Sequence, residues 1–274
     1  MTTLALTNQK GGVGKTTTCV NLAASLAANK QRVLLVDIDP QGNASMGSGI
    51  DKHELESSVY DVMVGGVPAE DVCQQSAFGF DVIPANDDLT AAEVELISMS
   101  GKESRLRYAL GRIKPHYDFI LIDCPPSLNM LTVNALVASD GVVIPVQCEY
   151  YALEGLTSLM NTVSHVQKVL NPSLVITGLV RTMFDPRNTL TNDVSMQLIN
   201  HFGDKVFRTQ IPRNVRLAEA PSHGLPVLQY DQGSRGAAAY LALAAELLRR
   251  FGRALSTPAT PSTLNSAAGS GYTA

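Results

Sequence analysis

The chain alternates between short, continuous apolar runs and longer segments in which apolar residues recur at helical spacing. In Arg32–Asp37 and Phe119–Asp123 almost every residue is apolar, rather than every second one. A strand that is covered on both faces shows this continuous pattern, which is typical of parallel sheets. The pattern predicts strands at Leu4–Thr7, Arg32–Asp37, Phe80–Ile83, Phe119–Asp123, Val142–Val146 and Val175–Val180.

Helical spacing fills the segments between these runs. Near the end of the chain, Leu241, Ala244, Leu248 and Phe251 recur at intervals that bring them to one helix face. Strands that alternate with helices favour a three-layer α/β fold, in which helices flank a mostly parallel sheet and the crossovers are right-handed. The expected helices are Lys15–Asn29, Glu103–Lys114, Tyr151–Leu170, Asn192–His201 and Ser234–Phe251.

The alternating pattern ends near residue 253. Residues 1–253 are expected to form a single domain, since α/β domains often reach about 250 residues. Residues 254–274 carry no charged side chain and are mostly Ser, Thr, Ala, Pro and Gly, so we expect a disordered, uncharged tail. The apolar runs are all much shorter than the roughly 18–20 residues that a membrane span needs.

Composition sharpens this interpretation. Hydrophobic residues make up 45% of the chain, and charged residues only 17%, against about 25% in a typical protein. The low charge fits a large sheet that is covered on both sides. The cysteines Cys19, Cys73, Cys124 and Cys148 form no C-x-x-C pair, so neither a zinc site nor a thioredoxin-like motif is indicated. A cytoplasmic protein with reduced thiols is the simplest interpretation.

Charge is unevenly distributed along the chain. The net charge is −4, but residues 1–150 carry 10 basic and 18 acidic side chains, whereas residues 151–274 carry 11 and 7. This excludes a uniformly basic nucleic-acid binder and leaves room for a basic face in the second half. On charge alone, an ordinary solvated surface is the simpler interpretation. One basic stretch contains Arg181, Arg187, Lys205, Arg208, Arg213 and Arg216.

The strongest motif is Lys10–Thr17, with the sequence K-G-G-V-G-K-T-T. It follows the first expected strand and opens a helix, which is the context of a phosphate-binding loop. Glycines allow the backbone N–H groups to face an anion, and the helix N-terminus adds favourable partial positive charge. We expect Lys15 to reach the β- and γ-phosphates of a nucleotide and the Thr16 hydroxyl to ligate Mg²⁺.

The loop departs from the usual pattern G-x-x-x-x-G-K-[ST] in one respect. Gln9 stands where that pattern has glycine, and Lys10 supplies a second lysine inside the loop. A solvated surface charge is one interpretation of Lys10. The sharper interpretation is a second cation that is aimed at phosphate, either in its own site or in a partner's.

Three aspartates end two of the expected strands. Asp37 and Asp39 close the second strand, and Asp123 closes the strand that begins at Phe119. Ligands of open α/β sheets bind at this edge. A buried strand that ends in aspartate matches the acidic partner of a phosphate loop, which holds Mg²⁺ directly or through water. Helix capping or a turn is the alternative role for each aspartate.

Together, these residues resemble the deviant Walker A ATPases, and among them the ParA/Soj partition proteins. The resemblance extends from about Thr3 to Phe251. The matching segments are Asn8–Thr17, Asp37–Asn43, Asp118–Leu128, Val146–Leu156, Ile211–Arg216 and Glu219–Gly224. The first three motifs belong to the whole superfamily, and the last three are much more specific to chromosomal ParA proteins. Plasmid relatives with a DNA-reading domain have residues before the first strand, membrane-positioning relatives end in a basic amphipathic helix, and nitrogenase-iron-protein relatives have cysteines that bridge a cluster. This sequence matches none of these three patterns.

The resemblance implies a role for each matching residue. Lys10 would be the signature lysine, which contacts the partner's nucleotide across an ATP-sandwich homodimer, and Gly11 would pack against that partner. Asp39 would orient or activate the attacking water, and Asp123 would bind Mg²⁺ through water. Adenine would lie near Thr182, Met183 and Pro212–Asn214. The nucleotide site would comprise Lys10, Gly11, Gly12, Val13, Gly14, Lys15, Thr16, Thr17, Met183, Pro212 and Asn214.

The resemblance also implies partners. Arg187 and Arg216 match positions where family members bind double-stranded DNA without base recognition, and a ParB-type centromere-binding protein would stimulate ATP hydrolysis. The ATP state would be nucleoid-associated, without a membrane contact. Three other functions remain open: a MinD-like membrane-positioning ATPase, a small-molecule kinase that uses the same loop, and an ATP-driven filament former.

Overall fold

The computed structural model describes residues 1–253, and the expected C-terminal tail lies outside the described residues. In this part of the chain, strands form one sheet in the order β3-β4-β2-β5-β1-β6-β7-β8. Neighbours are parallel throughout, except that β3 and β4 are antiparallel, which confirms the mostly parallel sheet. The strands are β1 (Thr2–Leu6), β2 (Val33–Asp37), β3 (Gln74–Gln75), β4 (Asp81–Ile83), β5 (Phe119–Asp123), β6 (Gly141–Gln147), β7 (Val175–Phe184) and β8 (Val206–Pro212).

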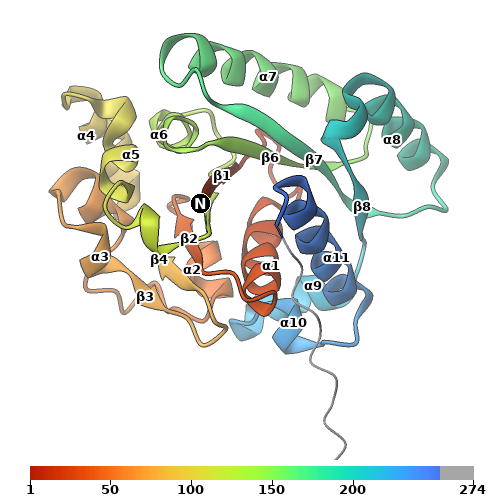
Figure 1. Cartoon of the computed structure of the whole chain (residues 1–274), viewed down its shortest axis with the longest axis horizontal. Coiled ribbons are helices and arrows are strands. Elements are labelled where there is room, and N and C mark those ends of the chain that lie inside the picture. The colour runs from red at the N-terminus through yellow and green to blue at the C-terminus, as the bar shows by residue number, and fades with distance from the viewer. Residues whose placement is uncertain (254–274) are drawn as a thin grey trace, which may run out of the picture.

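Helices cover both faces of the sheet (Figure 1), as the sequence predicts. One face packs against α1 and α11, and the other against the helices from α4 to α8. The helices are α1 (Lys15–Ala28), α2 (Asn43–Gly47), α3 (Ala69–Val72), α4 (Leu89–Ser98), α5 (Arg105–Leu110), α6 (Met130–Ala138), α7 (Ala152–Val169), α8 (Thr189–Phe202), α9 (Val215–Glu219), α10 (Val227–Tyr230) and α11 (Arg235–Arg250). A π-helical turn at Asp61–Gly65 and short 3-10 helices link some of them.

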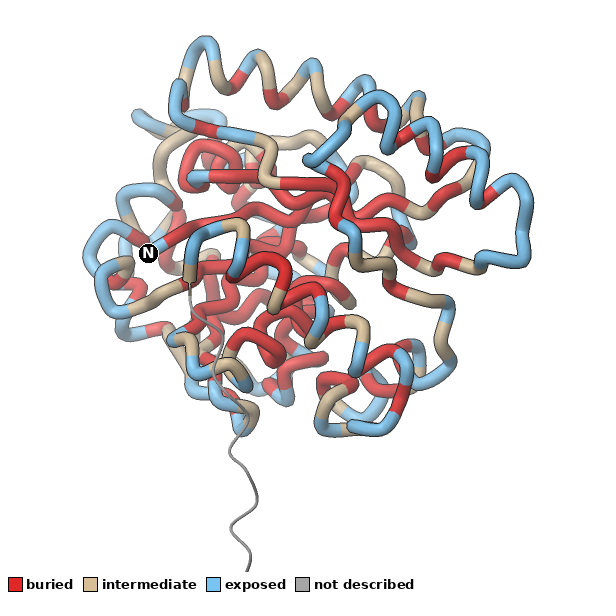
Figure 2. The backbone as a smooth tube through the Cα atoms, turned by 45° about the vertical axis from the view of Figure 1, so that its right-hand side comes forward, coloured by how far each residue is buried: buried red, intermediate tan, exposed pale blue. Residues whose placement is uncertain are grey.

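The central strands are buried along their whole length, and Figure 2 shows buried backbone running through the middle of the molecule. β1 lies between β5 and β6, and β5 also pairs with β2. In this register Leu6 lies opposite Asp123, and Asp123 lies opposite Asp37. The loop after β1 and the aspartates that end β2 and β5 therefore meet at the same edge of the sheet.

Several elements differ from the sequence prediction, among them β3 and α4, which the sequence did not predict, and three further ones. The helix expected at Glu103–Lys114 is reduced to α5, which is preceded by a 3-10 turn and followed by Gly111. Helix α6 was not expected, because nearly all of its residues are buried and the sequence therefore lacks an amphipathic period. Strand β8 was not expected either, because it lies at the edge of the sheet and includes the polar run Arg208–Gln210.

Candidate functional site

The loop between β1 and α1 is fixed by its own backbone and by two neighbouring strands. Gly12 and Gly14 have φ angles of 72° and 85°, in the left-handed region that favours glycine. The Asn8 side-chain amide donates to the carbonyl of Pro145 in β6 at 2.8 Å. The Thr182 hydroxyl of β7 donates to the carbonyl of Val13 at 2.8 Å. These contacts hold the loop in shape.

Lys15, Thr16 and Asp123 lie together at this edge, as the motifs predict. The Thr16 hydroxyl donates to Asp123 Oδ2 at 2.7 Å, while the buried Oδ1 has no partner among the described residues. Lys15 is 7% exposed, and its ammonium donates to the Lys10 carbonyl at 3.2 Å. Burial lowers the pKa of Lys15, and the charges of Asp123, Cys124 and Asp39 oppose that shift.

The carboxylates of this cluster differ in their surroundings. Asp37 is fully buried and accepts hydrogen bonds from the backbone and hydroxyl of Ser45, both at 2.8 Å. Burial raises the pKa of Asp37 to about 6, although these hydrogen bonds oppose the shift. Burial also raises the pKa of Asp123, and the nearby charge of Asp37 adds to that effect. Asp39, which is 8% exposed, accepts from the backbone N–H of Gln41 at 3.0 Å.

Lys10 makes a contact that the sequence did not predict. Its ammonium forms an ion pair of 2.7 Å with Glu149, which follows β6 and is also hydrogen-bonded by the Gln147 amide. Both partners are partly exposed. Next to Lys10 the backbone of Gly11 is exposed, and no atom lies within 4 Å of a Cβ built there. This corner of the loop is therefore open to an approaching molecule.

A cavity of about 300 Å³ lies beside the loop. It brings together Met183, Pro212 and Asn214, which the resemblance placed near adenine, with Gly14 and Thr17 of the loop. Met183 has a φ of 49°, which is uncommon for a residue other than glycine and marks local backbone strain. The cavity is also lined by Thr182 and Arg213, which the resemblance likewise placed near adenine, and by Ile211, Leu217, Ala218 and Tyr240.

The two expected DNA-binding arginines lie on the surface on different segments. Arg187 follows β7, is 88% exposed and pairs with Asp185 at 2.8 Å. Arg216 lies in α9, is half exposed, and pairs with Glu219 at 2.8 Å and with Asp231 at 3.2 Å. Each guanidinium therefore has an acidic neighbour. A phosphate group that binds either arginine has to compete with that neighbour.

Other basic residues of the second half serve the fold. Arg250 stacks 3.9 Å from the ring centre of Phe207, and Arg253 stacks 4.4 Å from that of Phe119. Arg181 is buried. The excess of basic over acidic residues in the second half of the sequence is therefore larger than the positive charge that is exposed on its surface.

The contacts that the sequence did not reveal are mainly those that brace the loop. Thr182 lies 169 residues from Val13, and Glu149 lies 139 residues from Lys10. No local pattern marks such contacts. Glu149 belongs to the segment Val146–Leu156, which carried the family resemblance, but its partner could be found only in the fold.

The donor set fits a magnesium nucleotide. Hydroxyl and carboxylate oxygens are the ligands that Mg²⁺ prefers, and the unpaired Oδ1 of Asp123 is free to accept from a metal-bound water. Backbone N–H groups, a lysine and a helix N-terminus suit phosphate. The fold and this arrangement together define the class of P-loop NTPases.

Comparison with known proteins specifies the class further. A family model described as an AAA domain matches residues 1–176. The sporulation initiation inhibitor protein Soj of Bacillus subtilis is 57% identical over 89% of this chain and 97% of its own. The chromosome partitioning protein ParA of Caulobacter vibrioides is 52% identical over 90% of this chain and 94% of its own. The chain belongs to the ParA/Soj family of chromosome partitioning ATPases.

A solved structure supports the same fold. Cobyrinic acid a,c-diamide synthase from Mycobacterium smegmatis, with bound ADP and magnesium, is 38% identical, with a TM-score of 0.81. The match covers 94% of this chain and 99% of that one. Within residues 1–253, none of the helices combines the length and apolar character that crossing a membrane requires.

Proposed function

We propose that the protein is an ATP-hydrolysing partition switch. In this proposal it dimerises on ATP, binds double-stranded DNA without sequence preference, and is stimulated by a ParB-type partner to segregate chromosomal or plasmid DNA. The single observation that carries the proposal is the Thr16–Asp123 hydrogen bond beside the buried Lys15, since it assembles phosphate and metal ligands at one sheet edge. Membership of the ParA/Soj family supplies the biological role.

The residues of the loop would bind and orient the nucleotide. The N–H groups of Gly11–Thr17 would surround the phosphates, with Lys15 on the β- and γ-phosphates. Thr16 and Asp123 would hold Mg²⁺, which neutralises charge on the phosphates when bound. The cavity at Met183, Pro212 and Asn214 would take the adenine. The hydrogen bond from Thr182 to the Val13 carbonyl would help to keep the loop in place around the phosphates.

Two further residues would serve hydrolysis. Asp39 would orient the attacking water, since its carboxylate lies in the charge cluster around Lys15. Lys10 would contact the nucleotide of the second subunit and stabilise the charge that develops in the transition state. For that contact Lys10 has to leave Glu149, which holds it within its own chain.

Attachment to DNA would depend on dimerisation. Two copies would combine their basic surfaces, including Arg187 and Arg216, so that binding gains avidity only in the ATP state. Phosphate contacts would dominate, so affinity should fall steeply with salt. Hydrolysis, stimulated by the ParB-type partner, would release the protein from the nucleoid.

The decisive experiment measures binding of the full chain to duplex DNA with ATP, with ADP and without nucleotide, at two salt concentrations. We expect binding only with ATP and a strong loss at the higher salt. DNA binding that is independent of nucleotide would contradict the switch. Co-sedimentation with anionic liposomes in place of DNA would instead support a membrane-positioning ATPase. ATP turnover that requires a small-molecule acceptor would support a kinase.

A further inference from the structure

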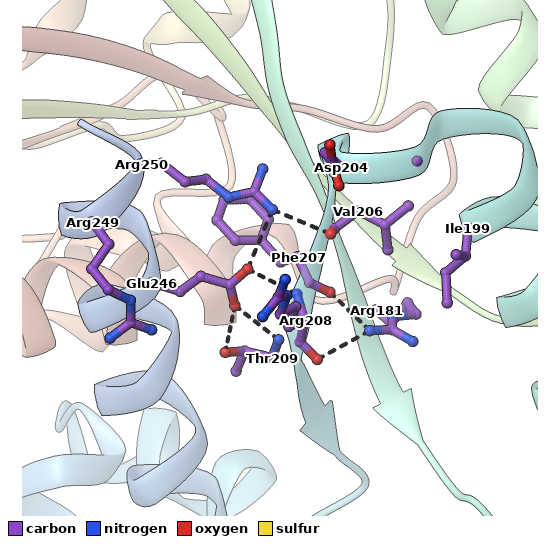
Figure 3. Close-up of a pocket in the computed structure, with 11 residues that line it drawn as sticks. Arg181, Ile199, Asp204, Val206, Phe207, Arg208, Thr209, Glu246, Arg249 and Arg250 are labelled. Carbon is purple, nitrogen blue, oxygen red and sulfur yellow. Dashed lines mark hydrogen bonds and ion pairs between the residues drawn. The ribbon is translucent and has the colours of Figure 1, made fainter. Parts of the chain in front are cut away.

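A second cavity, of about 660 Å³, lies far along the sheet at its edge strand β8. It is bordered by α8 and the turn Gly203–Lys205 on one side and by the end of α11 on the other. None of its lining residues belongs to the cavity beside the phosphate loop. We refer to it as the edge trough, and Figure 3 shows the residues that line it.

The edge trough contains a buried cation without a carboxylate partner. Arg181 is 5% exposed and donates to Ser195 Oγ at 2.9 Å. It also donates to the carbonyls of Phe207 and Arg208 at 2.8 and 3.1 Å (Figure 3). Its buried Nε has no partner among the described residues. A buried charge is costly unless it is paired, and neutral oxygens compensate it only in part. Within the described residues Arg181 therefore has hydrogen-bond acceptors but no carboxylate at ion-pair distance.

The carboxylates that line the trough form no ion pair with Arg181 within residues 1–253, although the nearby charge of Glu246 partly opposes the lowering of the Arg181 pKa by burial. Glu246 is already bound by the backbone N–H groups of Arg208 and Thr209, at 2.8 and 2.9 Å, and by Arg250 at 3.2 Å. Asp204 is exposed in the turn after α8. Four arginines thus face two carboxylates, one of which is fully engaged. The trough as a whole is positively charged.

Glu246 also indicates what the trough does not bind. Because its carboxylate occupies the N–H groups of Arg208 and Thr209, an added peptide strand cannot pair with β8 at that point. A small ligand needs no strand pairing. The side chains of Arg208 and Arg249, on β8 and α11, take part in no hydrogen bond or ion pair within residues 1–253, so both are available to it.

We propose that the edge trough binds a small phosphate-bearing ligand of nucleotide size. Guanidinium groups bind phosphate oxygens in bidentate geometry, and the volume is that of a small-molecule site. Arg208 of β8 and Arg249 of α11 bind the phosphate oxygens, and Arg181 supplies a buried positive charge next to them. Ile199, Val206 and the ring of Phe207 offer an apolar wall to the rest of the ligand.

The test titrates tripolyphosphate into the full chain by calorimetry, with the phosphate loop kept saturated by ADP and Mg²⁺. We expect one additional site per chain, and at least about tenfold weaker binding in Arg208→Gln/Arg249→Gln, since hydrogen bonds to charged groups are individually strong. Arg107→Gln, which removes an exposed arginine of α5, is the matched control and should bind as the native chain does. Equal thermal unfolding midpoints establish that the variants are folded.

A second arm separates a small ligand from DNA. Short duplex DNA is titrated into the ATP-bound protein, with and without tripolyphosphate, for the native chain and the double variant. The proposal requires that the variant binds DNA within about twofold of the native chain and that tripolyphosphate does not compete. Competition, together with equal losses for both ligands, would assign the trough to the DNA surface and overturn the proposal. Absence of the additional site, or an equal loss in Arg107→Gln, would overturn it as well.

Discussion

Lys10 and Glu149 are joined by an ion pair of 2.7 Å that links the phosphate loop to the segment after β6. A lysine that is proposed to act on a partner's nucleotide is thus held by a carboxylate of its own chain. Both side chains are partly exposed, so the pair is weak enough to exchange, as surface ion pairs generally are.

Glu149→Gln should therefore favour the ATP-dependent dimer. Removing the carboxylate frees Lys10 for the partner, and we expect the protein concentration at half-dimerisation to fall a few-fold, in keeping with a surface pair of at most about 1 kcal/mol. Sedimentation velocity with ATP and Mg²⁺ measures this. Glu154→Gln, in the first turn of α7, is the matched control. An unchanged or weaker dimer in Glu149→Gln would show that the pair does not restrain Lys10.

Asp39→Ala should separate binding from hydrolysis. The turn that follows Asp39 keeps its backbone hydrogen bond between the Gly42 N–H and the Asp39 carbonyl, so the fold should survive. We expect ATP binding close to native and a turnover rate lower by on the order of a hundredfold, because a residue that activates water contributes at least that much. Lys15→Ala, by contrast, should lose ATP binding itself. Native turnover in Asp39→Ala would remove its assignment as the water-orienting residue.

Arg216 should contribute to DNA binding and not to dimerisation. Arg216→Gln removes the positive charge while keeping a polar side chain, and it frees Glu219 and Asp231, which then repel phosphate. We expect weaker binding of every DNA sequence tested. The dependence of affinity on salt concentration should also decrease, by the equivalent of about one phosphate contact. Filter binding at several salt concentrations, with sedimentation as the dimer assay, measures both. Arg112→Gln, on the acidic half of the chain, is the control. Loss of the dimer together with DNA binding would make Arg216 a structural residue.

The sequence predicted most of the central sheet, because its strands are buried on both faces and read as continuous apolar runs. It did not predict β8, which runs along the edge of the sheet and mixes Val206 and Phe207 with Arg208 and Thr209. The same distinction holds for the site. Lys15 and Thr16 stand in one local motif, whereas Thr182 and Glu149 reach the loop only through the fold.

Buried Asp37 should make stability depend on pH. Its pKa is about 6 in the folded protein, because burial disfavours the charged form, against the ordinary value of 3.8. At a pH between these two values, the Asp37 carboxyl is protonated in the folded chain and ionised in the unfolded chain. Its contribution to the free energy of unfolding is therefore complete below pH 3.8 and is lost as the pH rises through about 6. When the pH is lowered from about 7.5 to about 5, protonation of Asp37 should increase the free energy of unfolding by roughly 1 kcal/mol.

Urea unfolding of the nucleotide-free protein at these two pH values, without Mg²⁺, measures that contribution as a difference between variants. Asp37→Asn cannot ionise, so it should lack this part of the pH dependence while keeping the parts due to other groups. Asp87→Asn, which removes a carboxylate that is 78% exposed, should retain the native dependence. If Asp37→Asn and the native chain gained equally on acidification, the Asp37 carboxyl would not be the group that titrates near neutral pH.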